Sequence, residues 1–261
     1  MKLHAQTYPN PDSEATPLVI LHGLLGSSRN WINMARRLSG ERPVWAIDLR
    51  NHGTSPHAET MAWEELVTDV TGTLATLGHP QVDLMGHSLG GKVAMRLAIE
   101  APEWVRRLIV VDIVPKVYPP YHSRDFEAML SLPLSELSSR KAADERLAEA
   151  VPDWAHRQFL LTNVKRSSDG GLAWAIPLRV LHQQLETLRG DSLPTDVAPK
   201  QTTLIVRGGK SRFIDDEDEA AVGERFPDCR FEHLAESGHN PHFDCPDRFA
   251  ETVEAFLPLR S

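Results

Sequence analysis

The sequence has little of what marks a secreted, metal-binding or membrane protein. Its 261 residues include two cysteines, Cys229 and Cys245, which show no metal-binding spacing and need not pair. No apolar run reaches membrane-spanning length, and residues 1–17 are polar and proline-rich, without the apolar stretch of a signal peptide. These absences favour a cytoplasmic protein with no membrane partner and no bound metal.

Basic residues are also fewer than acidic residues. The chain carries 28 Lys and Arg against 36 Asp and Glu, a net charge of −8, and no basic stripe is present. Nucleic-acid-binding proteins carry clustered Lys and Arg, so we expect no nucleic-acid partner. Hydrophobic residues make up 41% of the chain, which is enough for one well-buried core.

Short apolar runs alternate with segments of helical spacing in the first part of the chain. Continuous apolar runs are typical of strands buried on both faces of a sheet. They predict strands at Leu18–Leu21, Val44–Ile47, Val82–Met85 and Leu108–Val111, with helices between them at Asn30–Leu38, Met61–Leu77 and Gly90–Glu100. Repeated units of this kind indicate an α/β fold with a mostly parallel, doubly wound sheet.

The alternation stops after Val114. No strand is predicted from there to about Pro199, and the segment has a helical pattern interrupted by prolines. Strands then return at Thr203–Arg207 and Arg230–His233, with helices at Asp218–Phe226 and Arg248–Leu257. We therefore predict a core of residues 1–114 and 200–261 and a helical cap, residues 115–199, inserted above the sheet. The alternative is that this segment completes the core.

Ser88 lies between two glycines in the stretch DLMGHSLGGK, after an apolar run and before a helical segment. Gly-x-Ser-x-Gly in this context is a nucleophile elbow, a turn too tight for side chains at Gly86 and Gly90. It presents the serine hydroxyl above the sheet edge. The N–H of Leu89, at a helix N-terminus, points where an oxyanion would form. A helix-capping serine is the simpler alternative, but a cap needs neither glycine.

A serine hydroxyl needs a neighbouring base to act as a nucleophile at neutral pH. Among the 12 histidines, His239 follows the last predicted strand and precedes the last helix, at the same sheet edge as Ser88. Gly238 frees the backbone to turn that ring inward. His242 is the alternative base, and we expect it to support the loop instead. We expect His87 to pack or hydrogen-bond beside the site.

The matching acid should lie between the serine and the histidine in the chain, at the carboxyl end of a strand. Asp112 directly follows the LIVV strand, and we predict that it fixes the imidazole tautomer and stabilises the imidazolium. Asp215 and Asp216 are the alternatives, but they belong to an acidic run, DDEDE, that is typical of a solvated helix start. A loop-capping role is the alternative for Asp112 itself.

A second oxyanion donor is predicted in HGLLG, residues 22–26, which follows the first buried strand. The glycines let the backbone approach the site, and the N–H of Leu24 is the expected donor beside that of Leu89. His22 is expected to brace this loop. An ordinary turn at a strand end is the alternative.

At this point the chain resembles the α/β-hydrolases over nearly its whole length, and among them the YbfF-like esterases. The resemblance is carried by HGLLGS (22–27), DLRNHGTS (48–55), GHSLGGK (86–92), VDIVP (111–115), FLLTN (159–163), GGKS (208–211) and GHNPHFDCPDRF (238–249). It implies that the acid follows the sixth strand in the family's numbering, which fits Asp112. It also implies a serine, here Ser211, at the position where many relatives have the acid.

The resemblance implies hydrolysis of small acyl esters, or acyl thioesters, without a cofactor. We therefore predict a serine carboxylesterase that acts through Ser88, His239 and Asp112. We expect the cap aromatics Phe126, Trp154, Phe159 and Trp174 to form an apolar substrate pocket, although they could equally pack the cap onto the sheet. One alternative keeps the triad for carbon–carbon bond hydrolysis or cofactor-free perhydrolysis. Another is a non-catalytic binding protein, although none of the three triad residues is missing.

Overall fold

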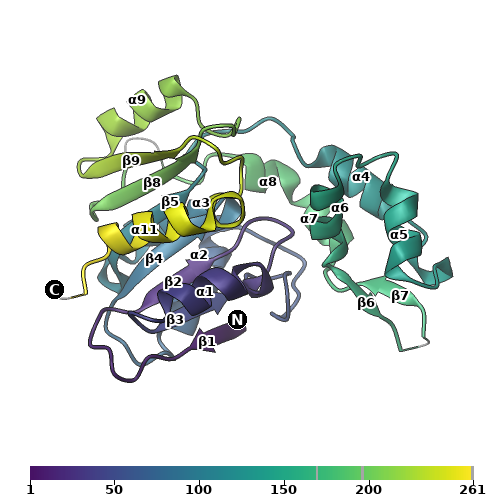
Figure 1. The fold of residues 1–261 in the computed structure, drawn as a ribbon, viewed down its shortest axis with the longest axis horizontal. Helices are drawn as coiled ribbons and strands as arrows, with labels where there is room; N and C mark the ends of the chain where they lie inside the picture. The colour runs from purple at the N-terminus through teal and green to yellow at the C-terminus, as the bar shows by residue number, and fades with distance from the viewer. Residues whose placement is uncertain (169, 195–196, 260–261) are drawn as a thin grey trace.

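The structure is a computed structural model that describes residues 1–168, 170–194 and 197–259. Within them, seven strands form one sheet in the order β1-β3-β2-β4-β5-β8-β9 (Figure 1). Neighbouring strands from β3 to β9 pair in parallel, whereas β1 pairs antiparallel with β3 at one edge. The strands are β1 (Ala5–Tyr8), β2 (Leu18–Leu21), β3 (Val44–Ile47), β4 (Val82–His87), β5 (Val105–Val111), β8 (Thr203–Gly208) and β9 (Cys229–Leu234). The predicted fold class, a mostly parallel α/β sheet, is confirmed.

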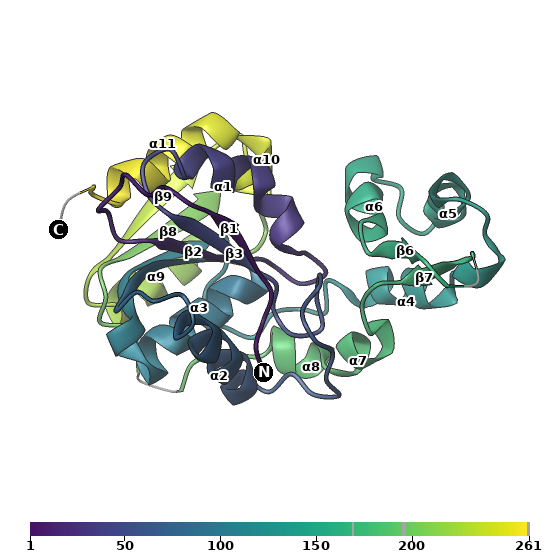
Figure 2. The same ribbon diagram turned by 90° about the horizontal axis from the view of Figure 1, so that it is seen from below.

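Helices cover both faces of this sheet (Figures 1 and 2). Along β2, Leu18 and Ile20 pack in the apolar layer of α1 and α11, whereas Val19 and Leu21 pack in the layer of α2 and α3. A strand covered on both sides has no polar face, which explains its continuous apolar run. The helical elements of the core are η1 (Ser28–Trp31), α1 (Ile32–Leu38), α2 (Trp63–Leu74), α3 (Leu89–Glu100), η2 (Pro102–Trp104), α9 (Asp216–Arg225), α10 (Pro241–Asp244) and α11 (Pro246–Phe256).

The segment between β5 and β8 projects from the core as a separate group of elements (Figure 1). It contains α4 (Ser123–Ser131), η3 (Leu134–Glu136), α5 (Arg140–Leu147), α6 (Trp154–Leu161), β6 (Val164–Arg166), β7 (Leu172–Trp174), α7 (Leu178–Gln183) and α8 (Leu185–Arg189). We call residues 115–199 the cap. The prediction of no strand here was wrong, because β6 and β7 pair as an antiparallel hairpin. Each has three residues, too few to show an alternating pattern.

The carboxyl ends of the parallel strands meet at one edge of the sheet, as parallel pairing requires. The loops after β2, β4, β5, β8 and β9 all leave from this edge. The strand before the cap is β5, the fifth along this chain. The edge therefore gathers every residue that the sequence proposed for catalysis.

Candidate active site

Ser88 joins the end of β4 to the start of α3 in a left-handed backbone conformation, with φ +51° and ψ −118°. A positive φ is uncommon for a residue with a side chain and is a strained backbone conformation. A Cβ at Gly86 would lie 2.1 Å from the carbonyl oxygen of Gly90, and one at Gly90 would lie 2.4 Å from that of Leu21. The two glycines are therefore required by the approach of neighbouring backbone, as the elbow motif predicts.

Asp112 follows β5, is fully buried, and also has a positive φ, +51°. Its Oδ1 accepts a hydrogen bond from the N–H of Gly208 at 2.9 Å. Its Oδ2 accepts one from the hydroxyl of Ser211 and another, at 2.8 Å, from Nδ1 of His239. Because a carboxylate only accepts, these contacts require the proton of the imidazole to lie on Nδ1. The other ring nitrogen, Nε2, is then free to accept a proton.

His239 lies on the loop between β9 and α10, and its side chain is 22% exposed. The ring of Phe213 stacks on it, with centroids 3.7 Å apart and an interplanar angle of 13°. Burial lowers the pKa of His239 below its ordinary 6.5, while the hydrogen bond to Asp112 acts in the opposite direction. The lowered pKa favours the neutral ring near neutral pH, the form that can accept a proton.

His87 and His242 pack next to the loop that carries His239. His87 Nε2 donates to the carbonyl oxygen of His239 at 2.7 Å, so it packs beside the site as expected. His242 is half-buried and stacks on Trp31, with centroids 3.9 Å apart. Burial lowers the pKa of His242 to about 3, which leaves it neutral. The histidine that hydrogen-bonds to Asp112 is His239, not His242.

The alternative acids are engaged elsewhere. Asp215 caps the N-terminus of α9, where it accepts the N–H of Asp218 at 2.8 Å. Asp216 is 96% exposed and pairs with Arg207. Both follow the pattern predicted for a solvated helix start, and the imidazole of His239 contacts Asp112 instead.

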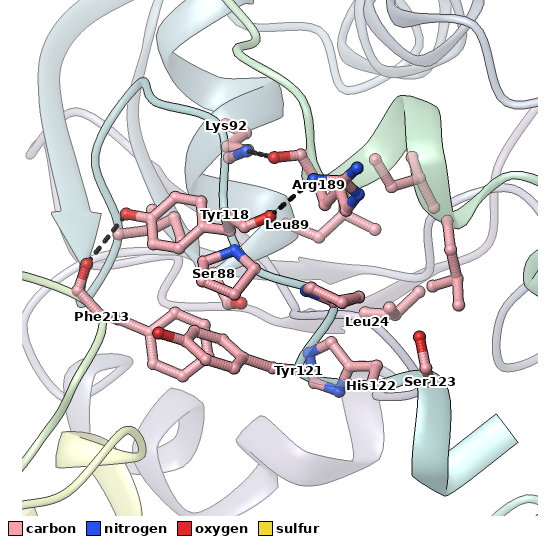
Figure 3. A pocket seen from close by; sticks show the side chains of 15 residues that line it. Leu24, Ser88, Leu89, Lys92, Tyr118, Tyr121, His122, Ser123, Arg189 and Phe213 are labelled. Atoms are coloured by element: carbon pink, nitrogen blue, oxygen red, sulfur yellow. Dashed lines mark hydrogen bonds between the residues drawn. The ribbon is translucent and has the colours of Figure 1, made fainter.

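Leu24 and Leu89 line the same cavity as Ser88 (Figure 3). In the described part of the chain, neither backbone N–H donates to another residue. Leu89 is the first residue of α3, where a helical N–H has no partner within the helix. The two amides are thus available to a negative charge that forms beside Ser88.

The loop that carries Leu24 is fixed by two buried histidines. His52 Nε2 accepts the N–H of Leu25 at 3.2 Å, and its Nδ1 donates to the carbonyl of Arg50 at 2.9 Å. His22 Nε2 accepts the N–H of Leu49 at 3.0 Å. Burial lowers the pKa of both rings, in His52 to about 3, so both stay neutral. The bracing role expected for His22 is present. His52, in the DLRNHGTS segment, is an additional support that sequence reasoning did not identify.

The cavity beside Ser88 is mostly apolar. Its wall comes from the elbow, from the start of the cap, from α8 and from the loop after β8 (Figure 3). The side chains that line it are Leu24, Ser88, Leu89, Lys92, Ile113, Tyr118, Pro119, Pro120, Tyr121, His122, Ser123, Leu185, Leu188, Arg189 and Phe213. Phe213 both lines the cavity and covers His239, which places the imidazole next to it.

The four predicted pocket aromatics lie elsewhere in this structure. Phe126 is fully buried and stacks on His182 within the cap. Trp154 is 65% exposed, and Phe159 stacks on His156. Trp174, from β7, lines a second groove between η3 and α7. Large apolar residues are needed inside the cap as well as in a pocket, and the lining near Ser88 comes from the segments that join cap and core.

The described residues contain no cluster of three or more His, Cys, Asp or Glu side chains arranged to hold a metal ion. None of the helices in the described ranges combines the length and apolar character that crossing a bilayer requires.

The alpha/beta hydrolase family matches residues 18–252, and the chain belongs to that family. It is a hydrolase. It is 36% identical to the sn-1-specific diacylglycerol lipase ABHD11 of Mus musculus, over 94% of this chain and 83% of that protein. It is 29% identical to the esterase YbfF of Escherichia coli, over 98% of each chain. The solved structure of a marine microorganism esterase superposes with a TM-score of 0.93 at 32% identity, covering 98% of this chain and 99% of the other.

Proposed function

We propose that this hydrolase is a serine carboxylesterase that cleaves small acyl esters through Ser88, His239 and Asp112. The observation that carries the proposal is the hydrogen bond from Nδ1 of His239 to the buried carboxylate of Asp112, beside a cavity lined by Ser88. A strained serine, an oriented neutral imidazole and two unpaired amides are the groups that acyl transfer requires. The esterase and lipase names of the relatives support the same reaction class.

The reaction would begin with attack of Ser88 Oγ on the ester carbonyl carbon, while Nε2 of His239 takes the hydroxyl proton. The N–H groups of Leu24 and Leu89 would hold the oxyanion of the tetrahedral intermediate. His239 then gives its proton to the leaving alcohol, and an acyl group remains on Ser88. Water, deprotonated by His239, releases the acid. Asp112 stays ionised throughout and stabilises the imidazolium.

The cavity indicates a neutral, apolar acyl or alcohol group as the substrate part next to Ser88. Its cationic side chains are already paired: Arg189 donates to Glu186 and to the carbonyl of Tyr118. The leucine, proline and tyrosine side chains that make up most of the wall offer contacts to hydrocarbon. Acyl thioesters share the reacting carbonyl and are the related alternative.

A fluorophosphonate probe followed by peptide mapping tests the nucleophile. We expect labelling of Ser88 in the wild-type protein and none in Ser88→Ala. Ester hydrolysis by that variant should fall by about three to six powers of ten, as for other activated nucleophiles. Ser131→Ala, at the end of α4 and outside the cavity, is the matched control and should be labelled and active. A wild-type protein that is not labelled at Ser88 would instead be a binding protein on a hydrolase scaffold.

A kinetic panel of acyl esters and thioesters of graded chain length tests the substrate class. We expect a higher kcat/KM on neutral acyl esters than on esters that carry a charged group next to the carbonyl. Equal turnover of charged and neutral acyl groups would contradict the apolar lining as the source of selectivity.

A further inference from the structure

Lys92 is a buried lysine on α3, one helical turn after Ser88. It is 2% exposed, and its side chain lines the cavity (Figure 3). Lysine is almost never buried this deeply unless its ammonium group is paired or hydrogen-bonded. The groups that accept hydrogen bonds from this ammonium therefore indicate the role of Lys92.

Three backbone carbonyl oxygens accept hydrogen bonds from Nζ of Lys92. They belong to Lys116 at 3.1 Å, to Arg189 at 3.2 Å, and to Gly190. The ring of Tyr118 lies 4.7 Å from the same nitrogen. An ammonium has three N–H donors, so all of them are used within the protein, and none remains for a substrate carboxylate.

These carbonyls come from both connections between core and cap. Lys116 lies on the segment that enters the cap, residues 114–121, which we call the entry segment. Arg189 and Gly190 lie at the end of α8, as the chain returns toward the core, in residues 189–193, which we call the exit segment. One side chain from α3, which we call the elbow helix, thus bonds to both ends of the cap, which are far apart in the sequence.

The two segments also bond to each other and to the loop after β8. The N–H of Tyr118 donates to the carbonyl of Arg189 at 2.9 Å, and the guanidinium of Arg189 donates to the carbonyl of Tyr118 at 3.0 Å. The hydroxyl of Tyr118 donates to the carbonyl of Phe213 at 3.0 Å. Phe213 in turn stacks on His239. Short contacts therefore lead from Lys92 through both segments to the imidazole.

We propose that Lys92 is a positioning residue that ties the entry and exit segments to the elbow helix and thereby fixes the cavity wall formed by Tyr118 and Arg189. The effect on substrate rests on the proposed esterase function, because that wall would contact the acyl or alcohol group. A purely structural lysine would instead contribute to global stability alone. The two roles differ in what they predict for local exchange and for KM.

The test compares Lys92→Met and Lys92→Gln with the wild-type protein. Methionine keeps the apolar stem and removes all three donors, whereas glutamine keeps two donors and no charge. The three hydrogen bonds are only partly buried, so water can replace the lost donors and the fold should persist. Lys141→Met removes a lysine that is 86% exposed on α5 and is the matched control.

The first measurement is amide hydrogen exchange of the full chain, without substrate. Burial lowers the pKa of Lys92 to about 7, so exchange is compared at about pH 6, where the ammonium is charged. We expect exchange in the entry and exit segments to accelerate about tenfold or more in Lys92→Met, the effect of losing hydrogen bonds from a charged donor. Lys92→Gln should be intermediate, and the sheet should not change.

The second measurement is the separation of KM from kcat on a neutral acyl ester. We expect KM to rise about tenfold in Lys92→Met, with a smaller change in kcat, because the wall moves while the triad stays in place. Lys92→Gln should again be intermediate, and Lys141→Met should match the wild type.

Two results would overturn the proposal. One is an amide exchange rate equal to that of the wild-type protein in both segments, measured in whichever of the two variants folds. The other is a drop in melting temperature with uniform acceleration of exchange and an unchanged KM, which is the signature of a merely structural lysine. The exchange readout needs no activity. If the wild-type protein hydrolysed no ester, the proposed function would be wrong. The hydrogen-exchange comparison would still test whether Lys92 positions the two segments.

Discussion

The ring of Phe213 lies almost parallel to the imidazole of His239, with 3.7 Å between the centroids. Phe213 is itself held on both sides of its backbone. Its N–H donates to the hydroxyl of Ser211 at 3.2 Å, and its carbonyl accepts from Tyr118 at 3.0 Å. An aromatic face fixed in this way excludes water from one side of the imidazole, and that burial lowers the pKa of His239.

Replacement of Phe213 by alanine should move the activity profile toward higher pH. Water would reach the imidazole, the desolvation that lowers the pKa of His239 would shrink, and the pKa would rise toward 6.5. The base must be neutral to act, so the acid limb of kcat/KM would shift upward. A pH–rate profile from about pH 4 to 9 measures the shift. Phe213→Leu, which keeps an apolar cover, should shift less. An acid limb that stays in place in Phe213→Ala would contradict this account.

Asp112→Asn should lower kcat by about four powers of ten with little change in KM. Asparagine has the same shape and tolerates the positive φ of this position, so the backbone should hold. The amide cannot stabilise the imidazolium, and it favours the wrong tautomer. Steady-state kinetics with Asp215→Asn as the control check the assignment. A comparable loss in the control, with Asp112→Asn active, would move the acid to the start of α9.

Ser211→Ala should have a much smaller effect on kcat than Asp112→Asn. The carboxylate would lose one hydrogen bond but keep those from Gly208 and His239. Loss of a hydrogen bond to a charged group corresponds to about ten- to a hundredfold. The same kinetic assay measures it, with Ser211→Thr as the variant that keeps the hydroxyl. A loss as large as that of Asp112→Asn would show that the hydroxyl does more than support the acid.

Gly90→Ala should destabilise the protein by about 1 to 3 kcal/mol, because the added methyl group overlaps backbone. Its Cβ would lie 2.4 Å from the carbonyl oxygen of Leu21 and 2.6 Å from that of His22. Gly72→Ala, within α2 and with no atom within 4 Å of the added Cβ, is the matched control and should gain about 0.5 to 1 kcal/mol. Urea denaturation measures both. Equal stability of the two variants would mean that the elbow can relax around a side chain.

The sequence predicted the buried parallel strands well because each carries an apolar side chain on both faces. Leu18–Leu21 and Val44–Ile47 have the same ends in the prediction and in the structure. The edge strand Ala5–Tyr8 was missed, since it is largely exposed and its four residues show no apolar run. The β6–β7 hairpin was missed because each of its strands has only three residues. Such strands are defined by the neighbour they pair with, which a local pattern does not contain.

The candidate site shows a similar division. Ser88, His239 and Asp112 carry local signals: flanking glycines, a strand end and an order along the chain. Phe213 has no such signal, because a phenylalanine in a loop can pack against anything nearby. Ser211 was noticed at the position where many relatives have the acid, but its hydrogen bond to Asp112 depends on two loops meeting in space. The sequence around the cap aromatics does not indicate which residues they pack against.

The contact between Tyr118 and Arg189 has a consequence for how this architecture tolerates change. Since the two ends of the insertion are already adjacent, the entropy of closing it grows only slowly with the number of residues between them. Lengthening, shortening or exchanging the helices beyond this junction should therefore cost the sheet little. Substrate selectivity could then be varied in this part of the chain while the candidate catalytic residues remain unchanged.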